Sequence, residues 1–357
     1  MKDLGLLTGG RFALATVLSA SGSAPRPVGT TMAVREDGSV VGSLSGGCVE
    51  AAVHAVALEV LRTGEARVET YGVSDGDALE AGLTCGGNIS VLVRPGSAEA
   101  LEQVQAHESV ALATVVGSGA SVVVTADEVF GSTGDLGLDI AVVDDARGAL
   151  AAGTTVVRHY GASGQRRVDD TAVLVQVWSP PARMLVYGAT DFARALAGAG
   201  RFLGYRVTVC DARPVFATPS RFPEADEVVN RWPHDHLRDE VLAGRVDERT
   251  VVAVLTHDPR FDVPLLVEAL TSPAGYVGAM GSRRTHDARI VELRAAGLDA
   301  LALSRLRSPI GLDIGGRTPE ETAISIVAEI VQQRWGGTGR PLTRTDGDIH
   351  WTLELVR

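Results

Sequence analysis

The feature that most constrains this sequence is the regular alternation of short apolar segments and amphipathic segments after residue 183. Such alternation is typical of βαβ units, in which a helix returns the chain to begin the next parallel strand. A last helix is predicted to begin at Pro319, where Thr318 and Glu321 have the spacing of a capping box. We expect strands at residues 184–187, 206–210, 250–256 and 276–277, and helices at residues 191–203 and 263–270.

The chain is predicted to divide at Ser179-Pro180-Pro181, where a Val-rich region gives way to this α/β pattern. We expect an N-terminal α/β domain at residues 1–180, followed by a Rossmann-like parallel-sheet domain at residues 181–335. Residues 336–357 are rich in Gly, Thr and Arg, which predicts a loose C-terminal tail.

The N-terminal half shows a weak internal repeat. ALATVLSA from Ala13 is echoed by ALATVVGS from Ala111, and VGSLSG from Val41 is echoed by VFGSTG from Val129. We interpret these echoes as a degenerate internal duplication. The second copy lacks the GCVE segment of the first, so chemistry is expected in the first copy. There we predict strands at residues 12–19, 31–35 and 40–44 and a helix at residues 49–62.

Charge and hydropathy limit the classes of partner. A net charge of −11 argues against nucleic acid and anionic membranes, which attract clustered positive charge. No apolar run approaches the roughly 20 residues of a membrane helix, and the N-terminus does not have the pattern of a secretory signal. We therefore expect a cytoplasmic protein that binds small molecules or other proteins.

Three side chains in the N-terminal half are candidates for binding a metal, sulfur or an anion. Cys48 and Cys85 each adjoin a glycine pair, where backbone amides favour the thiolate, and thiolates bind soft metals. Arg26 lies between two prolines, and a fixed guanidinium suits phosphate or carboxylate. A buried structural cysteine and an ordinary turn are the alternative interpretations. Cys210 lies in a predicted strand and is expected in the core.

The turn GATDFA after the first strand of the second half has the layout of a nucleotide-binding βαβ unit. Gly188 permits a tight turn, and Asp211 ends the next strand. However, Thr190 replaces the second glycine of the usual fingerprint, and Asp191 places negative charge where a phosphate would lie. Two interpretations stay open: a nucleotide site, or a Rossmann-like domain without tightly held NAD(P).

Polar loops also follow the later strands of the predicted parallel sheet. Ligands of open α/β sheets bind at the carboxyl ends of the strands, so His257, Gly311 and Asp313 are expected to line one crevice. His257 and His286 have no second histidine at helical spacing, which favours hydrogen bonding over metal binding.

Seven motifs occur in order over nearly the whole chain: GSAPRPVG, GSLSGGCVEAAV, GLTCGG, GATDFARAL, THDPRFD, YVGAMGSRRTH and PIGLDIGGRTPEETAISIVAEI. Together they resemble the XdhC/CoxI family, the accessory proteins of xanthine dehydrogenase and related molybdenum hydroxylases. The resemblance implies a cytoplasmic homodimer that binds molybdenum cofactor (molybdopterin) and protects it while its terminal sulfur is installed. It also implies delivery to an apo-hydroxylase, and so a maturation factor rather than a catalyst.

The resemblance further implies a cysteine desulfurase as a possible second partner. GATDFA departs from the GAGHVA of many members, which weakens the expectation of a bound dinucleotide. The alternative hypothesis is an NAD(P)-dependent oxidoreductase with His257 or His286 as its acid-base group. The expected cofactor contacts are Arg26, Cys48, Cys85, Gly188, Asp211, His257, Gly311 and Asp313, with Cys48 and Cys85 also as metal ligands.

Overall fold

The computed structural model describes residues 10–21, 26–72, 87–166, 168–256 and 258–346. The chain forms two compact units, which meet in sequence between Pro180 and Pro181, and the C-terminal unit spans Pro181–Thr345. Among the described residues, no helix combines the length and the apolar character that crossing a membrane requires.

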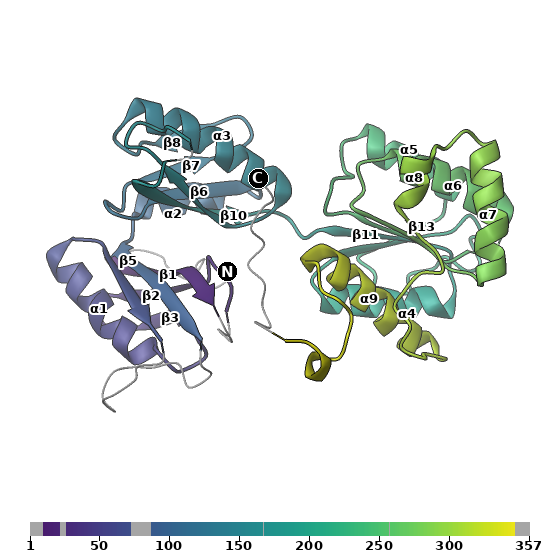
Figure 1. The fold of residues 1–357 in the computed structure, drawn as a ribbon, viewed down its shortest axis with the longest axis horizontal. Coiled ribbons are helices and arrows are strands. Elements are labelled where there is room, and N and C mark those ends of the chain that lie inside the picture. Colours follow the sequence, from purple (N-terminus) through teal and green to yellow (C-terminus); the bar gives the residue numbers. More distant parts are fainter. Residues whose placement is uncertain (1–9, 22–25, 73–86, 167, 257, 347–357) are drawn as a thin grey trace. The chain divides into compact units, whose positions relative to one another are not determined.

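The N-terminal unit contains one α/β arrangement twice, and we call the copies the first and second subdomains (Figure 1). Their antiparallel sheets have the equivalent strand orders β3-β2-β1-β5-β4 and β8-β7-β6-β10-β9. The predicted internal duplication is therefore confirmed. The first subdomain comprises β1 (Phe12–Ser21), β2 (Thr31–Arg35), β3 (Val40–Gly42), α1 (Glu50–Thr63), β4 (Arg67–Tyr71) and β5 (Asn88–Pro95). After α2 (Ala98–Ala106), the second comprises β6 (Val110–Val115), β7 (Ser121–Val124), β8 (Val129–Gly131), α3 (Leu136–Ala152), β9 (Val156–Tyr160) and β10 (Thr171–Trp178).

One face of each sheet packs against the helix of its own subdomain. In the first subdomain, Val53 and Val60 of α1 share a core with Ala13 and Val17 of β1. The alternation along the repeated ALATV segment follows the pleat of the strand, since Ala13 and Ala15 face α1 and Leu14 faces the other side of the sheet, where it is also buried. The second core has the same plan, with Leu138, Val142 and Ala146 of α3 and Ala111 and Ala113 of β6.

Both subdomains depend on a glycine at the end of the third strand. Gly42 and Gly131 have φ angles of +87° and +90°, which only glycine adopts without strain. A Cβ atom on either would lie 2.6 Å from the carbonyl oxygen of Thr31 or Ser121 on the paired strand. The VG echo in the sequence therefore marks a shared backbone requirement.

The C-terminal unit is a six-stranded parallel sheet with the order β13-β12-β11-β14-β15-β16, and the predicted Rossmann-like fold is confirmed. Helices α4 and α9 cover one face of the sheet, and α5, α6 and α7 cover the other (Figure 1). The strands are β11 (Arg183–Tyr187), β12 (Arg206–Cys210), β13 (Glu227–Val229), β14 (Val251–Val254), β15 (Tyr276–Ala279) and β16 (Leu306–Arg307). The helices are α4 (Asp191–Phe202), α5 (Pro233–Leu242), α6 (Pro259–Thr271), α7 (Arg283–Ala295), α8 (Ala300–Ser304) and α9 (Pro319–Trp335), followed by the 3₁₀ turn η2 (Leu342–Arg344).

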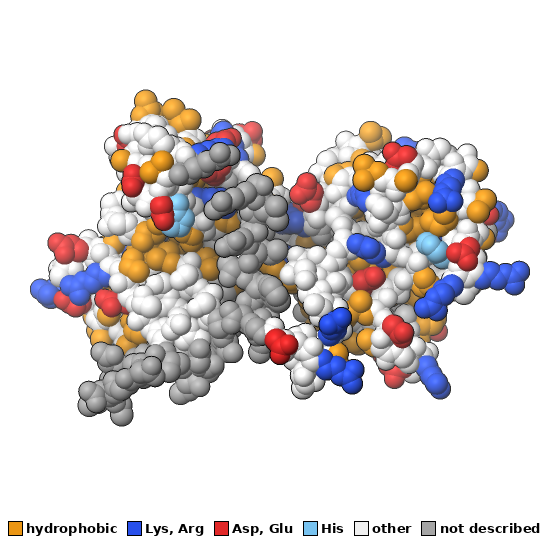
Figure 2. Space-filling model, in the orientation of Figure 1, with side chains coloured by type: hydrophobic (Ala, Val, Ile, Leu, Met, Phe, Trp, Pro, Cys, Tyr) orange, Lys and Arg blue, Asp and Glu red, His pale blue; other side chains and the backbone are white. Residues whose placement is uncertain are grey.

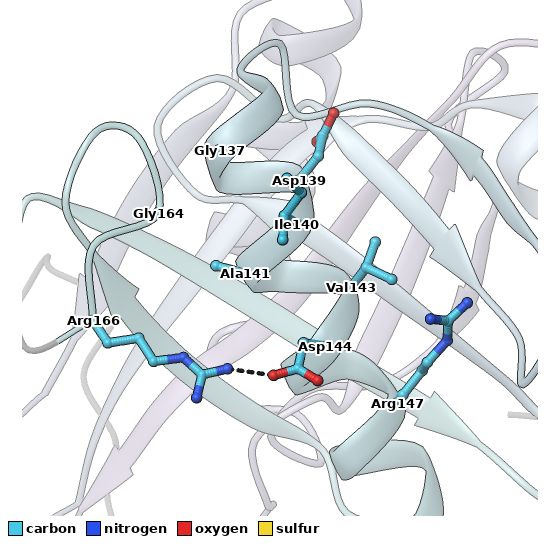
Figure 3. Close-up of a pocket in the computed structure, with 9 residues that line it drawn as sticks. All are labelled: Gly137, Asp139, Ile140, Ala141, Val143, Asp144, Arg147, Gly164 and Arg166. Atoms are coloured by element: carbon cyan, nitrogen blue, oxygen red, sulfur yellow. Dashed lines mark hydrogen bonds and ion pairs between the residues drawn. The ribbon is translucent and has the colours of Figure 1, made fainter.

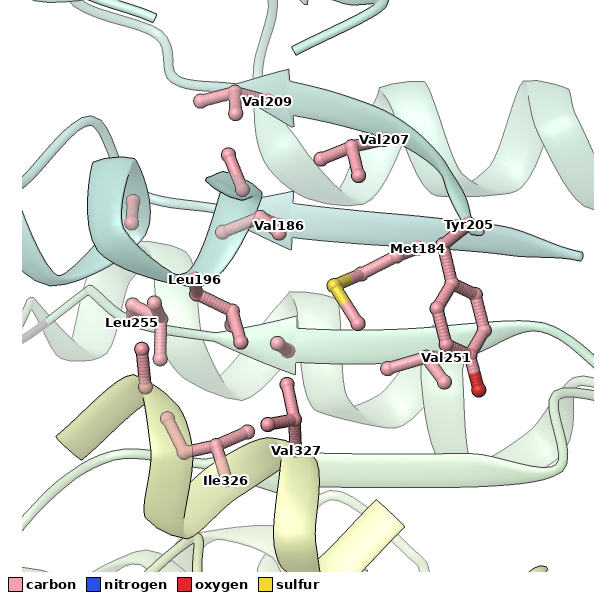
Figure 4. Close-up of a cluster of buried hydrophobic side chains, with 14 of the residues drawn as sticks. Met184, Val186, Leu196, Tyr205, Val207, Val209, Val251, Leu255, Ile326 and Val327 are labelled. Atoms are coloured by element: carbon pink, nitrogen blue, oxygen red, sulfur yellow. The ribbon is translucent and has the colours of Figure 1, made fainter. Parts of the chain in front are cut away.

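The core of this unit on the α4 side is mainly aliphatic, with Tyr205, Phe222 and Tyr276 as its buried aromatic residues. Leu196 of α4 and Ile326 of α9 pack onto the central strands, where Met184 and Val186 face them (Figure 4). Strands buried on both faces read as continuous apolar runs. This explains why the strands of this half were recognisable from the sequence.

Local sequence signals predict the start of one helix correctly and the start of another incorrectly. The capping box is confirmed, since Thr318 accepts from the Glu321 amide and the Glu321 carboxylate accepts from the Thr318 amide. The predicted start of α6 at residue 263 was wrong. The helix begins at Pro259, because the Asp258 side chain caps it by accepting from the backbone amide of Arg260.

Charged side chains of both signs lie on the surface of the C-terminal unit, among exposed apolar side chains such as Phe202 and Leu242. Figure 2 shows basic and acidic side chains interspersed on its visible face. The ion pair between Arg238 and Glu268, 2.7 Å long, links α5 to α6 at this surface. Interspersed charge of this kind is the usual pattern of a solvated protein surface.

A buried ion pair joins the carboxyl ends of three strands. Arg289 of α7 donates to the Asp262 carboxylate over 2.8 Å, and both side chains are almost fully buried. Arg289 also donates to the Met280 carbonyl after β15 and to the Ser308 hydroxyl after β16, and Asp262 accepts from the Thr256 hydroxyl after β14. The network therefore fixes these strand ends relative to one another.

Replacing Asp262 with Asn leaves the buried Arg289 guanidinium without its counter-charge. We expect the free energy of unfolding of the C-terminal unit to fall by about 3 kcal/mol. Urea unfolding of the full chain measures this loss. Asp258→Asn is the matched control, since it keeps the helix cap and removes only an exposed ion pair with Arg260, for less than about 1 kcal/mol. Equal losses in the two variants would contradict the assignment.

Candidate functional site

The loop that carries Cys48 is organised around one carboxylate. The loop at residues 43–49 joins β3 to α1, and Glu50 is the first residue of that helix. Its carboxylate accepts from the hydroxyls of Ser43 and Ser45 at 2.7 and 2.6 Å. The backbone amides of Leu44, Ser45, Gly46, Gly47 and Val49 also donate to it, at 2.8 to 3.2 Å.

This amide cradle holds Glu50 in its charged form. Partial burial raises the pKa of Glu50, but the hydroxyl and amide hydrogen bonds led by Ser45 outweigh burial, so the pKa lies well below its usual value. Converging amides and the positive end of α1 both favour an anion at this point. The loop is therefore an anion-binding turn whose anion is supplied by the chain itself.

Cys48 is exposed next to this cradle. Its amide donates to the Ser45 hydroxyl at 3.0 Å, which ties the backbone of the cysteine to the same network. The amides of Leu44, Ser45, Gly46, Gly47 and Val49, which the sequence analysis expects to favour the thiolate, donate to the Glu50 carboxylate. The result is a thiol presented on an ordered turn.

Glu50 was missed in the sequence analysis, although a signal was present. A Glu at the first helical position, directly after a Ser/Gly-rich turn, is favoured by the helix dipole and can reach back to loop amides. The same serine that bonds its carboxylate, Ser45, also bonds the Cys48 amide.

The second subdomain keeps a reduced form of this arrangement. Asp139 of α3 occupies the place of Glu50 and accepts from Ser132 and Thr133 at 2.6 to 2.7 Å. Burial raises the pKa of Asp139, but these bonds lower it below the usual value. No cysteine lies in this turn. The second copy thus retains the carboxylate and has lost the thiol.

A surface hollow of about 720 Å³ lies beside Asp139 on α3. Figure 3 shows Ile140 and Val143 on the helix, and Arg166 reaching Asp144 from the neighbouring loop. The ion pair between Arg166 and Asp144 is 2.6 Å long. The hollow is open and mixes apolar and charged side chains.

The structure brings Gly188 and Asp211 together at the carboxyl edge of the parallel sheet, as expected. Gly188 has a φ angle of +108°, and a Cβ there would lie 2.8 Å from the Thr256 methyl group. The buried Asp211 carboxylate accepts from the Ala189 amide at 2.7 Å and from the amide and guanidinium of Arg213 at 2.7 to 2.9 Å.

These bonds occupy both oxygens of Asp211. Burial raises its pKa, but the Arg213 guanidinium and the Ala189 amide lower it below the usual value. In a dinucleotide site an acid at this position binds ribose hydroxyls. Here a ribose would have to displace Arg213. Thr190 is also engaged, because its hydroxyl caps α4 by accepting from the Ala193 amide.

The other expected residues lie on other segments of the chain. Gly311, whose amide donates to the Glu329 carboxylate at 2.8 Å, and the exposed Asp313 belong to the loop between β16 and α9. Arg26 belongs to the N-terminal unit and is exposed. His257 and Cys85 lie outside the described residues.

The acidic, cysteine and histidine side chains of the described residues do not gather into a metal site. No group of three or more of them is placed to hold a metal ion in this part of the chain. His286 at the start of α7 has a buried Nδ1 atom without a hydrogen-bond partner among the described residues.

The fold and the site define a class of protein: a Rossmann-type unit joined to a duplicated α/β unit, in whose described part Cys48 is exposed. Residues 184–330 match the family model of the XdhC Rossmann domain, and residues 6–72 and 103–161 match that of the XdhC and CoxI family. The latter two segments fall on the first and second subdomains. The chain belongs to the XdhC/CoxI family.

Several known proteins are similar over almost the whole chain. The molybdenum cofactor insertion chaperone PaoD of Escherichia coli is 26% identical, over 92% of this chain and 85% of that protein. A protein of Bacillus subtilis named as a probable subunit of xanthine dehydrogenase is 28% identical, over 90% and 92%. A crystal structure named as a xanthine dehydrogenase from Bacillus halodurans has a TM-score of 0.67 and 25% identity, over 97% and 98% of the two chains.

Replacing Glu50 with Gln removes the charged acceptor of the cradle. Because partly buried loop amides then face an amide group, we expect a loss of about 2 to 4 kcal/mol in the free energy of unfolding of the N-terminal unit. Urea unfolding at neutral pH measures it, and faster hydrogen exchange in α1 localises it. Glu59→Gln, on the exposed side of the same helix, is the control and should cost less than about 1 kcal/mol.

We also expect the difference in stability between the wild type and Glu50→Gln to depend on pH. The folded-state pKa of Glu50 lies below its ordinary value of 4.5, so its stabilisation is complete above that pH and is lost as the pH falls through the acid range. We expect the wild type to lose stability more steeply below this pH than Glu50→Gln does. If the free energy of unfolding fell equally with pH in the two proteins, the role assigned to the Glu50 carboxylate would be contradicted.

Proposed function

We propose that this protein binds molybdenum cofactor as cargo and supports its insertion into a xanthine dehydrogenase-type molybdenum hydroxylase. The observation that carries the proposal is similarity over 92% of the chain to a protein named as a molybdenum cofactor insertion chaperone. The name of the Bacillus subtilis relative supports the same class of client. The alternative, an NAD(P)-dependent oxidoreductase, gains no support from these relatives.

In this proposal Cys48 is the contact for molybdenum or its sulfur ligand. Its exposure and its position on an ordered turn support this role, because a soft metal prefers sulfur ligands and cargo must be able to enter and leave. The ordered turn reduces the entropy that binding would otherwise cost. Cys85 is proposed as a second contact on the sequence motif alone.

The finer parts of the proposal rest on the family resemblance. They are sulfuration of the bound cofactor with a cysteine desulfurase as sulfur source, and a homodimeric carrier. The remaining proposed contacts to the cofactor or its phosphate are Arg26, Gly188, Asp211, His257, Gly311 and Asp313.

The experiment measures retention of cofactor by the purified protein. Wild type is incubated with molybdenum cofactor and separated by gel filtration, and the protein fraction is oxidised to release the fluorescent pterin. We expect near-stoichiometric pterin in the wild type and at least a tenfold loss in Cys48→Ser, since a hydroxyl is a poor ligand for a soft metal. Cys85→Ser and the double variant divide the loss between the two thiols.

Cys210→Ala is the control, because this third thiol is buried in β12 and donates to the Arg231 carbonyl. It should retain the wild-type amount of pterin. Retention that does not depend on either thiol would keep the carrier function and remove Cys48 and Cys85 from it. Absence of pterin in the wild-type fraction would contradict the proposal as a whole.

A further inference from the structure

A buried arginine lies between the two subdomains of the N-terminal unit. Arg94 of β5 pairs with Leu14 of β1, and in the second subdomain Gln176 of β10 pairs with Leu112 of β6. Leu14 and Leu112 are equivalent in the repeated ALATV segment. Arg94 and Gln176 therefore hold the same position in the two copies, and each is only 4% exposed.

Gln176 uses its position to bind the first subdomain. Its side-chain amide donates to the Gly29 carbonyl at 3.2 Å and to the Thr31 hydroxyl at 3.0 Å. The equivalents of these two residues in the second subdomain are Gly119 and Ser121. The equivalence is supported by matching bonds, because Thr31 and Ser121 donate to the carbonyls of Gly29 and Gly119 at 3.0 and 3.1 Å.

Arg94 approaches its reciprocal partner but does not bond it. Its stem passes Gly119, where an added Cβ would lie 3.7 Å from the Arg94 Cβ. In the part of the chain that the structure describes, its one hydrogen bond joins Nη1 to the Pro95 carbonyl at 3.1 Å, and it forms no ion pair there. A guanidinium has five donors. Most of its donors therefore have no protein partner among the described residues.

Arg94 stays charged although its side chain is buried. Burial lowers its pKa to about 10, so the guanidinium is still protonated at neutral pH. A mostly buried charge is costly unless it is paired, and proteins usually place an opposite charge beside it. The described residues supply no such charge to Arg94.

A small cavity adjoins the guanidinium. Arg94, Ser97, Thr31 and Gln176 are its polar lining residues, and its free volume of about 20 Å³ is that of a water-sized space. Ser97 is the N-cap of α2 and accepts from the Ala100 amide at 3.1 Å, so the first-turn amides before Ala100 are those without a partner within the helix. The donors of Gln176 and Thr31 bond protein oxygens, so the Arg94 guanidinium and the N-terminus of α2 are the groups that attract an anion here.

We propose that this cavity is a binding site for a small oxyanion group of carboxylate or phosphate type, with Arg94 as the residue that selects for negative charge. The site lies on the face of the first sheet that carries Leu14, whereas α1 covers the face that carries Ala13 and Val17. It is therefore separate from Cys48 and does not depend on the proposed function.

The test measures thermal unfolding of the full chain in increasing formate or inorganic phosphate, with ionic strength held constant by chloride. We expect the unfolding midpoint of the wild type to rise saturably with at least one of the two anions. A response to formate alone identifies a carboxylate-sized site, and a response to phosphate identifies a site that widens to admit a larger group. No saturable response to either anion would overturn the proposal.

Arg94→Gln is the matched variant, because it places in the first subdomain the residue that the second already has at this position. We expect it to lose the anion response while keeping at least wild-type stability without added anion, since it removes a buried unpaired charge. Arg147→Gln, at an exposed position on α3, should keep the full response. A response that survives in Arg94→Gln would overturn the proposal. If that variant does not fold, calorimetric titration of the wild type decides, and absence of saturable heat overturns it.

Discussion

The cysteine-bearing loop depends on the hydrogen bonds that the Glu50 carboxylate accepts. A tight turn of seven residues exposes several amides that no strand or helix can satisfy, and unsatisfied amides are costly wherever water is excluded. Glu50 accepts from five of these amides and two hydroxyls. One side chain therefore determines both where α1 begins and how Cys48 is held.

The duplicated unit shows which features of an α/β arrangement are fixed by backbone geometry and which are free to vary. Both copies keep the strand order, the terminal glycine of the third strand and an acidic residue in the first turn of the helix. The first copy has the Cys48 thiol in its turn and Arg94 at the subdomain contact, whereas the second has no thiol there and has Gln176 at the contact. These differences change the side-chain chemistry and leave the backbone fold unchanged. The two copies therefore carry different side chains on a common backbone frame.

The sequence predicted the parallel sheet, the duplication and the capping box, because each leaves a local pattern of apolar periodicity or cap residues. It did not predict that the loop amides would donate to Glu50, since that contact depends on how the turn closes in space. It brought Gly188 and Asp211 together correctly, but it gave no sign that Arg213 would occupy the Asp211 carboxylate. The partner of a long polar side chain depends on the three-dimensional arrangement of the loops, which the periodicity of apolar residues in the sequence does not reveal.

The reciprocal placement of Arg94 and Gln176 has a consequence for how such a unit could arise. In an isologous dimer of one subdomain, the same residue would occupy this position on both sides. Two arginines would then bring two buried positive charges to one contact, whereas two glutamines could each bond the opposite turn. Joining both copies in one chain removes the requirement for self-complementarity. Gene fusion therefore permits an asymmetric contact that free association of identical halves would select against.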